Sequence, residues 1–158
     1  MDFKLSKVIE ILTLKKKTLS TMESCTGGFI VSSFTNVDGA SNVIKYSAVT
    51  YCNDFKIKMG VPADIIDKYT VYSKETARAM ACAISNFSSS DYGVGITGKL
   101  GTIDKNNKTG DDNEVFVSIY DKTNDNYLDL DIFVNGLSRK ECKNQILNVI
   151  VDKFLEII

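Results

Sequence analysis

Histidine is absent from this chain of 158 residues. A Ser-His-Asp triad and a Cys-His pair are therefore excluded, and a zinc site would lack its commonest ligand. Any acid–base chemistry has to use Lys, Asp, Glu, Tyr, Cys or a backbone group. The missing histidine restricts the possible enzyme mechanisms more than any other property of the composition.

Long apolar stretches are absent as well. No run approaches the roughly 18 apolar residues that a membrane span requires. The first residues, MDFKLSKVIE, interleave charges with apolar side chains, which is unlike a signal peptide. We therefore expect a cytoplasmic protein without a membrane partner. Because a chain of 158 residues can bury a core without disulfides, we expect a single domain over residues 1–158.

Paired cysteines and clustered basic residues are also lacking. The four cysteines form no CxxC pair, which argues against a zinc or redox motif and favours buried thiols. The net charge is −1, from 19 basic and 20 acidic residues without a strong basic cluster. Nucleic acid is therefore not an expected partner, because neutralising phosphates requires a local excess of Lys and Arg.

The hydrophobic pattern predicts alternating helices and strands. The predicted helices span residues 1–16, 29–36, 53–61, 63–69, 73–87 and 139–158. The predicted strands span residues 17–23, 45–51, 91–98, 114–121 and 127–134. The last two strands flank the turn KTNDN, which predicts an antiparallel hairpin with one solvated face. This order predicts an α/β fold, a single-domain layered α/β/α sandwich with a mixed sheet.

The segment ESCTGG, residues 23–28, places small polar residues between the first predicted strand and the following helix. A glycine turn at this place can point backbone N–H groups at a small space, where the helix dipole favours negative charge. Ser and Thr also cap helices, and Gly shapes turns for purely structural reasons, so both interpretations stay open. The segment is neither a P-loop nor a GxGxxG motif.

Three other segments carry polar residues near predicted strand ends. Ser41 lies in the loop VDGASN, and Tyr51 and Lys56 lie around the end of the second strand. Thr97 and Gly98 end the third strand. Ligands of α/β sheets gather beyond the carboxyl ends of the strands, so these segments could share one crevice.

Five motifs together carry a family resemblance. In order they are ESCTGG, GAS, the pattern Y-x-N-x-x-K-x-x-x-G-V from Tyr51 to Val61, VYSKETARAMA and ITG. They resemble the carboxy-terminal domain of the competence-damage inducible protein CinA, a family that includes stand-alone nicotinamide mononucleotide amidohydrolases. The similarity covers nearly the whole chain and ends with Arg139 at the start of the last predicted helix.

The resemblance implies a serine/lysine hydrolase of pyridine nucleotide salvage that converts nicotinamide mononucleotide to nicotinate mononucleotide and ammonia. Lys56 matches the lysine of the family motif, and a lysine in a desolvated pocket is a suitable base for a serine hydroxyl. Ser24 and Ser41 both fall on serine positions of the family. Ser41 is slightly favoured as the nucleophile because it lies in a loop, and the opposite assignment stays open. Tyr51 is expected to position the lysine or the pyridine ring.

Further expectations concern substrate binding and assembly. Backbone N–H groups in the turn Thr26, Gly27 and Gly28, or at Thr97 and Gly98, could bind the developing oxyanion or the substrate phosphate. Arg139 could bind the phosphate with two hydrogen bonds. The reaction requires no metal or organic cofactor, the partner is a small-molecule nucleotide, and the resemblance implies a homo-oligomer.

The sequence departs from the family in one loop and in the last predicted helix. Family members commonly read TG-x-AGP after the third strand, whereas this chain reads TGKLGTIDKNN and places Lys99 near the expected pocket. Lys143 stands where the family tends to have a second arginine, and Lys does not replace Arg at a bidentate phosphate site. The altered loop over residues 99–104 leaves open an alternative, a catalytically silent or re-targeted nucleotide-binding or regulatory domain of the same family.

Overall fold

A computed structural model describes residues 2–101, 104–135 and 138–158 of the chain. Five strands form one sheet in the order β2-β1-β3-β4-β5. The strands are β1 Leu19–Glu23, β2 Ile44–Val49, β3 Tyr92–Gly98, β4 Glu114–Asp121 and β5 Asn126–Phe133. Strand β1 pairs in parallel with β2 and β3, while β3, β4 and β5 pair antiparallel. The sheet is therefore mixed, as predicted.

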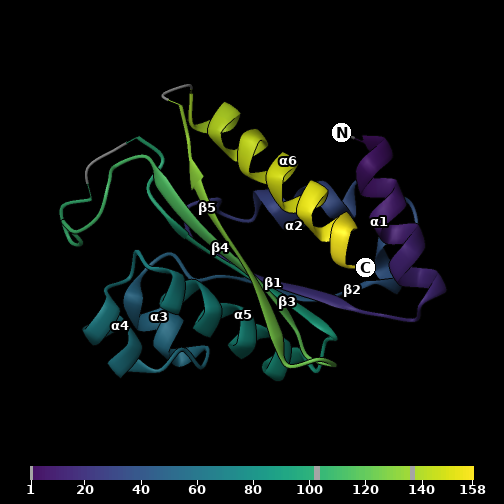
Figure 1. Cartoon of the computed structure of the whole chain (residues 1–158), viewed down its shortest axis with the longest axis horizontal. Coiled ribbons are helices and arrows are strands. Elements are labelled where there is room, and N and C mark those ends of the chain that lie inside the picture. Colours follow the sequence, from purple (N-terminus) through teal and green to yellow (C-terminus); the bar gives the residue numbers. More distant parts are fainter. Residues whose placement is uncertain (1, 102–103, 136–137) are drawn as a thin grey trace.

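Helices cover both faces of this sheet (Figure 1). One layer contains α1 Asp2–Leu14, α2 Phe29–Thr35 and α6 Arg139–Ile157, and the other contains α3 Asn53–Lys58, α4 Ala63–Tyr69 and α5 Lys74–Ser88. A short 3-10 helix, η1 Ala40–Asn42, precedes β2. The predicted α/β/α sandwich is confirmed. Among the described residues, no helix has both the length and the apolar character needed to cross a bilayer.

Local signals in the sequence explain where the main helices begin and what they bury. Ser73 caps α5 by accepting a hydrogen bond from the Thr76 backbone N–H. Ser138 and Glu141 form a reciprocal capping box at the start of α6. Apolar residues at helical spacing on α1 and α6 join the larger core cluster between these helices and the sheet.

Two glycines allow α5 to lie directly on β3. A Cβ added at Gly93 would come within 2.0 Å of the Ala81 carbonyl oxygen, and one at Gly95 within 2.2 Å of the Ala77 carbonyl oxygen. The helix backbone therefore occupies the space that side chains of β3 would fill. This contact fixes the height of α5 above the strand whose carboxyl end borders the candidate site.

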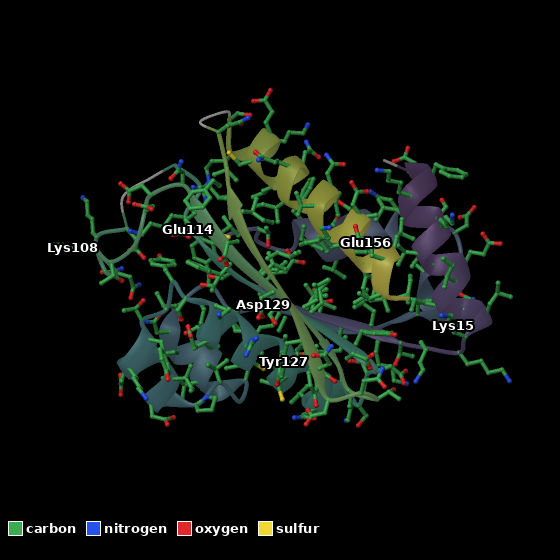
Figure 2. The ribbon with its side chains drawn as sticks, viewed as in Figure 1. Lys15, Lys108, Glu114, Tyr127, Asp129 and Glu156 are labelled. Carbon is green, nitrogen blue, oxygen red and sulfur yellow. The ribbon has the colours of Figure 1, made fainter. Side chains whose placement is uncertain are left out.

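The expected solvated face of the β4–β5 hairpin is only partly open to water, where Asp131 and Phe133 of β5 are exposed. Ser118 of β4 is fully buried and donates a hydrogen bond of 3.0 Å to Asp129 of β5. Arg78 of α5 donates hydrogen bonds from Nε and Nη2 to the Asp129 carboxylate and lies over the Tyr127 ring. Figure 2 labels Asp129 and Tyr127 on this strand. Helix α5 therefore covers part of this polar face, which the alternating pattern by itself could not predict.

The connections open a crevice at one edge of the sheet. The chain leaves the carboxyl end of β1 toward β2 on one side and leaves β3 toward β4 on the other side. Loops that follow neighbouring parallel strands and diverge in this way leave a space between them, which is the usual ligand site of open α/β sheets.

Candidate active site

A cleft of about 650 Å³ lies at this edge of the sheet. It is bordered by the segments that follow β1, β2 and β3 and by the start of α6. The residues that line it include Ser24, Cys25, Tyr51, Asp54, Gly98, Lys99, Asp104 and Arg139. Four residues predicted for the site, Ser24, Tyr51, Gly98 and Arg139, therefore meet in one cavity.

Lys56 and Ser24 form the central contact of this site. Lys56 lies on α3 with only 1% of its surface exposed, and its Nζ lies 3.1 Å from Ser24 Oγ. The same Nζ donates a hydrogen bond of 2.7 Å to the Thr50 carbonyl oxygen. Thr50 is itself anchored to the end of β1, because its backbone N–H donates to the Glu23 carbonyl oxygen at 2.8 Å. The residues after β1 and β2 thereby hold the lysine against the serine.

Burial adjusts the protonation of this lysine. Removal from water lowers the pKa of Lys56 to about 8, and the neighbouring Cys25, followed by Cys52 and Asp104, opposes this effect by raising the pKa. A large share of Lys56 is therefore neutral near pH 8. A neutral amine can accept the proton of Ser24 while it still donates to the Thr50 carbonyl, so the geometry permits general-base chemistry.

Glu23 occupies the turn that was expected to bind an anion. Its carboxylate is fully buried and accepts hydrogen bonds from Thr26 Oγ1 at 2.7 Å and from the Gly28 backbone N–H at 3.0 Å. It also accepts from the backbone N–H groups of Ile30 at 3.2 Å and Val31 at 2.9 Å. The negative charge favoured at the first turn of α2 thus comes from the protein.

These bonds correct the expected roles of Thr26, Gly27 and Gly28. The Gly27 backbone N–H donates to the Ser24 carbonyl oxygen at 3.0 Å, and the donors of Thr26 and Gly28 are taken by Glu23. The Gly27 and Gly28 backbone N–H groups are therefore engaged within the turn, as is the Thr26 hydroxyl. Their role is to hold the turn that carries Ser24, and the acidic residue directly before the turn was the sequence signal that pointed to it.

Ser41 lies away from the cleft. It is exposed on η1, which precedes the amino end of β2, whereas Ser24 follows the carboxyl end of β1. The two strands are parallel, so the serines lie at opposite ends of a strand that is about 20 Å long at ~3.3 Å per residue. The structure brings Ser24, and not the favoured Ser41, to Lys56.

Tyr51 and Arg139 meet at the rim of the cleft. Tyr51 is 65% exposed, and its hydroxyl lies 3.5 Å from Arg139 Nη2, which donates to it. Arg139 is the first residue of α6, and Lys143 follows one turn later on the same helix. Lys143 Nζ lies close to Gly27, since a Cβ added there would be 3.6 Å away. Tyr51 therefore borders the cleft beside an arginine, and two basic side chains of α6 lie near the Ser24 turn.

Thr97 and Gly98 contribute differently from the expectation. The Thr97 hydroxyl is fully buried and donates to the Val71 carbonyl oxygen at 2.9 Å, so it supports the strand end and does not face a ligand. Gly98 lines the cleft, and a Cβ added there would approach the Glu114 carbonyl oxygen to 2.5 Å. A larger residue at position 98 would collide with β4.

The cysteines are all free thiols, and two of the four are buried as expected. Cys25 and Cys142 are buried, Cys52 is exposed at the start of α3, and Cys82 is partly exposed. Burial raises the pKa of the Cys25 thiol to about 12. Cys25 borders the cleft as a neutral thiol and does not compete with Ser24 as a nucleophile.

The altered loop forms one wall of the cleft, although its residues 102–103 lie outside the described part. The Lys99 side chain is 3% exposed, forms an ion pair of 3.2 Å with Asp112, and lies over the Tyr72 ring. The Tyr72 hydroxyl donates a hydrogen bond to Asp104. Neither Tyr72 nor Asp104 was predicted as a site residue from the sequence. The available signals were the VYSKETARAMA motif, which contains Tyr72, and the loop that departs from the family pattern, which contains Asp104.

Comparison with known proteins identifies the family of this chain. The profile of the family described as CinA C-terminal domain matches residues 2–157. The chain belongs to this family. A CinA-like protein of Flavobacterium psychrophilum is 36% identical over 111 residues, which is 70% of this chain and 26% of that protein. A CinA-like protein of Endomicrobium trichonymphae is 42% identical over 94 residues, 59% of this chain and 22% of that protein. The chain thus spans about a quarter of the length of the curated relatives it matches.

Solved structures of the CinA family share the fold. The competence/damage inducible protein CihA of Agrobacterium tumefaciens superposes with a TM-score of 0.87 at 25% identity, covering 98% of this chain and 93% of that one. A CinA superfamily protein of Escherichia coli has a TM-score of 0.87 at 19% identity, covering 98% and 88%. The CinA architecture therefore extends over nearly the whole chain.

Proposed function

We propose that this CinA-family domain is an amidohydrolase that cleaves the carboxamide of nicotinamide mononucleotide, with Ser24 as nucleophile and Lys56 as general base. The observation that carries the proposal is the buried 3.1 Å contact between Lys56 Nζ and Ser24 Oγ at the wall of a cleft. Activating a serine hydroxyl requires a base within hydrogen-bond distance, and this chain has no histidine for that role.

The chemistry proceeds in two half-reactions. Ser24 Oγ attacks the carboxamide carbon while Lys56 Nζ takes the hydroxyl proton, and the protonated lysine then donates that proton to the departing nitrogen, which leaves as ammonia. Water attacks the resulting nicotinate ester, Lys56 takes a proton from this water, and the proton returns to Ser24 Oγ as the ester bond breaks. The products are nicotinate mononucleotide and ammonia, and the enzyme is restored.

The basic residues of α6 are suited to the anionic end of such a substrate. Arg139 lines the cleft and can offer two parallel N–H donors to a phosphate. Lys143, one turn further along α6, adds a positive charge near the Ser24 turn but lacks the planar fork of arginine. We infer that Arg139 binds the phosphate directly and that Lys143 contributes mainly through its charge.

The silent-domain alternative would be favoured if Lys56 were paired with a carboxylate and turned away from serine. In the described part of the chain, the hydrogen bonds of Lys56 Nζ go to Ser24 and to the Thr50 carbonyl, and no carboxylate forms an ion pair with it. This arrangement supports the active form.

Ammonia release from nicotinamide mononucleotide tests the proposal. We expect Ser24→Ala and Lys56→Ala to lower kcat by about 10³-fold or more, the usual loss for a nucleophile or its base. Ser41→Ala is the matched serine variant outside the cleft, and we expect it to keep kcat within about twofold of the wild type. A well-folded wild type without turnover would reject this substrate, and a loss confined to Ser41→Ala would reject Ser24 as the nucleophile.

A further inference from the structure

Asp104 presents an uncompensated negative charge to the cleft. Its carboxylate accepts hydrogen bonds from the Tyr72 hydroxyl, from the Asn106 backbone N–H at 2.8 Å and from Asn107 Nδ2 at 3.0 Å. All three donors are neutral, and no lysine or arginine in the described ranges forms an ion pair with Asp104. The hydrogen bond from Tyr72 is the main reason that the pKa of Asp104 falls to about 2. The residue is therefore ionised throughout the physiological range.

The neighbouring cation of the same wall is already paired. Lys99 Nζ lies 3.2 Å from Asp112 Oδ1 and 3.4 Å from the Gly110 carbonyl oxygen. The Lys99 charge is thus largely offset by Asp112, which does not line the cleft. Asp104 and Ser24 line the same cleft, and the Asp104 carboxylate makes a small contribution that raises the pKa of Lys56. A ligand bound beside Ser24 would therefore experience the negative charge of Asp104.

We propose that Asp104 is a specificity-determining residue that favours carboxamides attached to a positively charged ring. This inference rests on the proposed function. In a nicotinamide nucleotide the ring nitrogen is quaternary, so the ring next to the reacting carboxamide carries a full positive charge. The reduced 1,4-dihydro nucleotide has the same phosphate and carboxamide but a neutral ring. The substrate class of the cleft is thus an N-substituted pyridinium carboxamide with an anionic tail.

Binding to a chain that cannot turn over tests this inference. In a Ser24→Ala background, isothermal titration with nicotinamide mononucleotide and with its 1,4-dihydro form compares the two ring charges directly. We expect Asp104→Asn to weaken binding of the pyridinium nucleotide by about twofold to fivefold, the range for a partly screened charge pair, and to leave the dihydro nucleotide unchanged. Asn keeps the size of Asp and one acceptor oxygen, and Asp104→Glu, which restores the charge, should restore most of the preference.

Asp54→Asn serves as the matched control, because Asp54 also lines the cleft but is exposed on α3. Stronger screening by water should make its effect on the preference smaller than that of Asp104→Asn. Two results would overturn the role of Asp104. One is that Asp104→Asn weakens the binding of both nucleotides equally, and the other is that Asp104→Asn and Asp54→Asn change the preference for the charged ring equally. A failure of the Ser24→Ala chain to bind either nucleotide would instead reject the proposed function together with this inference.

Discussion

The protonation of Lys56 has a measurable effect on the stability of the whole domain. Its pKa falls from 10.5 to about 8 because the folded chain removes it from water, and each pKa unit corresponds to ~1.4 kcal/mol. Protonated Lys56 therefore destabilises the folded state by about 3 kcal/mol relative to the unfolded chain.

The sign of the pH dependence follows from the lowered pKa. Between pH 8 and pH 10.5 the unfolded chain holds the Lys56 proton while the folded chain has lost it. Stability rises with pH wherever the unfolded state binds more protons. The free energy of unfolding of the wild type, measured against a Lys56→Met variant, should therefore increase by about 3 kcal/mol between pH 7 and pH 10.5.

Urea denaturation of both proteins across this pH range provides the assay, and the difference between the two curves cancels the titration of their common residues. Lys58→Met, which removes an exposed lysine of the same helix, is the control for losing a lysine from α3. A difference between wild type and Lys56→Met that does not change with pH would refute the lowered pKa, and with it the argument that Lys56 is a base.

Three further predictions concern activity and stability. The kcat/KM for nicotinamide mononucleotide should rise with pH and level off above about pH 8, because only neutral Lys56 can accept the Ser24 proton; a flat profile from pH 6 to pH 9 would contradict this. Glu23→Gln should lower the free energy of unfolding by about 2 kcal/mol or more, because the amide replaces one acceptor oxygen by a donor that faces backbone N–H groups. Urea denaturation measures this loss, and unchanged stability would remove Glu23 as the anchor of the turn. Gly95→Ala should cost about 3 kcal/mol by the same assay, since its Cβ would lie 2.2 Å from the Ala77 carbonyl oxygen, and a neutral result would mean that α5 shifts without penalty.

Much of the fold was predictable because its signals are local. The helix predicted over residues 73–87 corresponds to α5, Lys74–Ser88, since a serine cap and an apolar stripe act within one element. The predicted strand over residues 114–121 coincides with β4. The solvated face predicted for the hairpin holds only in part, because alternation shows that one face is polar but not what covers it. Whether water or Arg78 meets that face depends on where α5 packs.

Ser24, Ser41 and Lys56 were all predicted as site residues, but the sequence did not indicate which serine contacts the lysine. Ser41 is 15 positions from Lys56 in the sequence and Ser24 is 32 positions away. Sequence distance therefore favours the serine that the structure places at the far end of β2. Which serine meets the lysine is decided by the parallel pairing of β1 with β2, which brings the carboxyl ends of both strands to one edge.

By itself, the sequence determined the order of helices and strands, the family, and the need for a base other than histidine, because these depend on composition and local pattern. Only the tertiary structure decided that Ser24 faces Lys56, that Glu23 fills the turn expected to bind an anion, and that Asp104 faces the cleft. Each of these depends on which strands and loops become neighbours, and on which buried polar groups then satisfy one another.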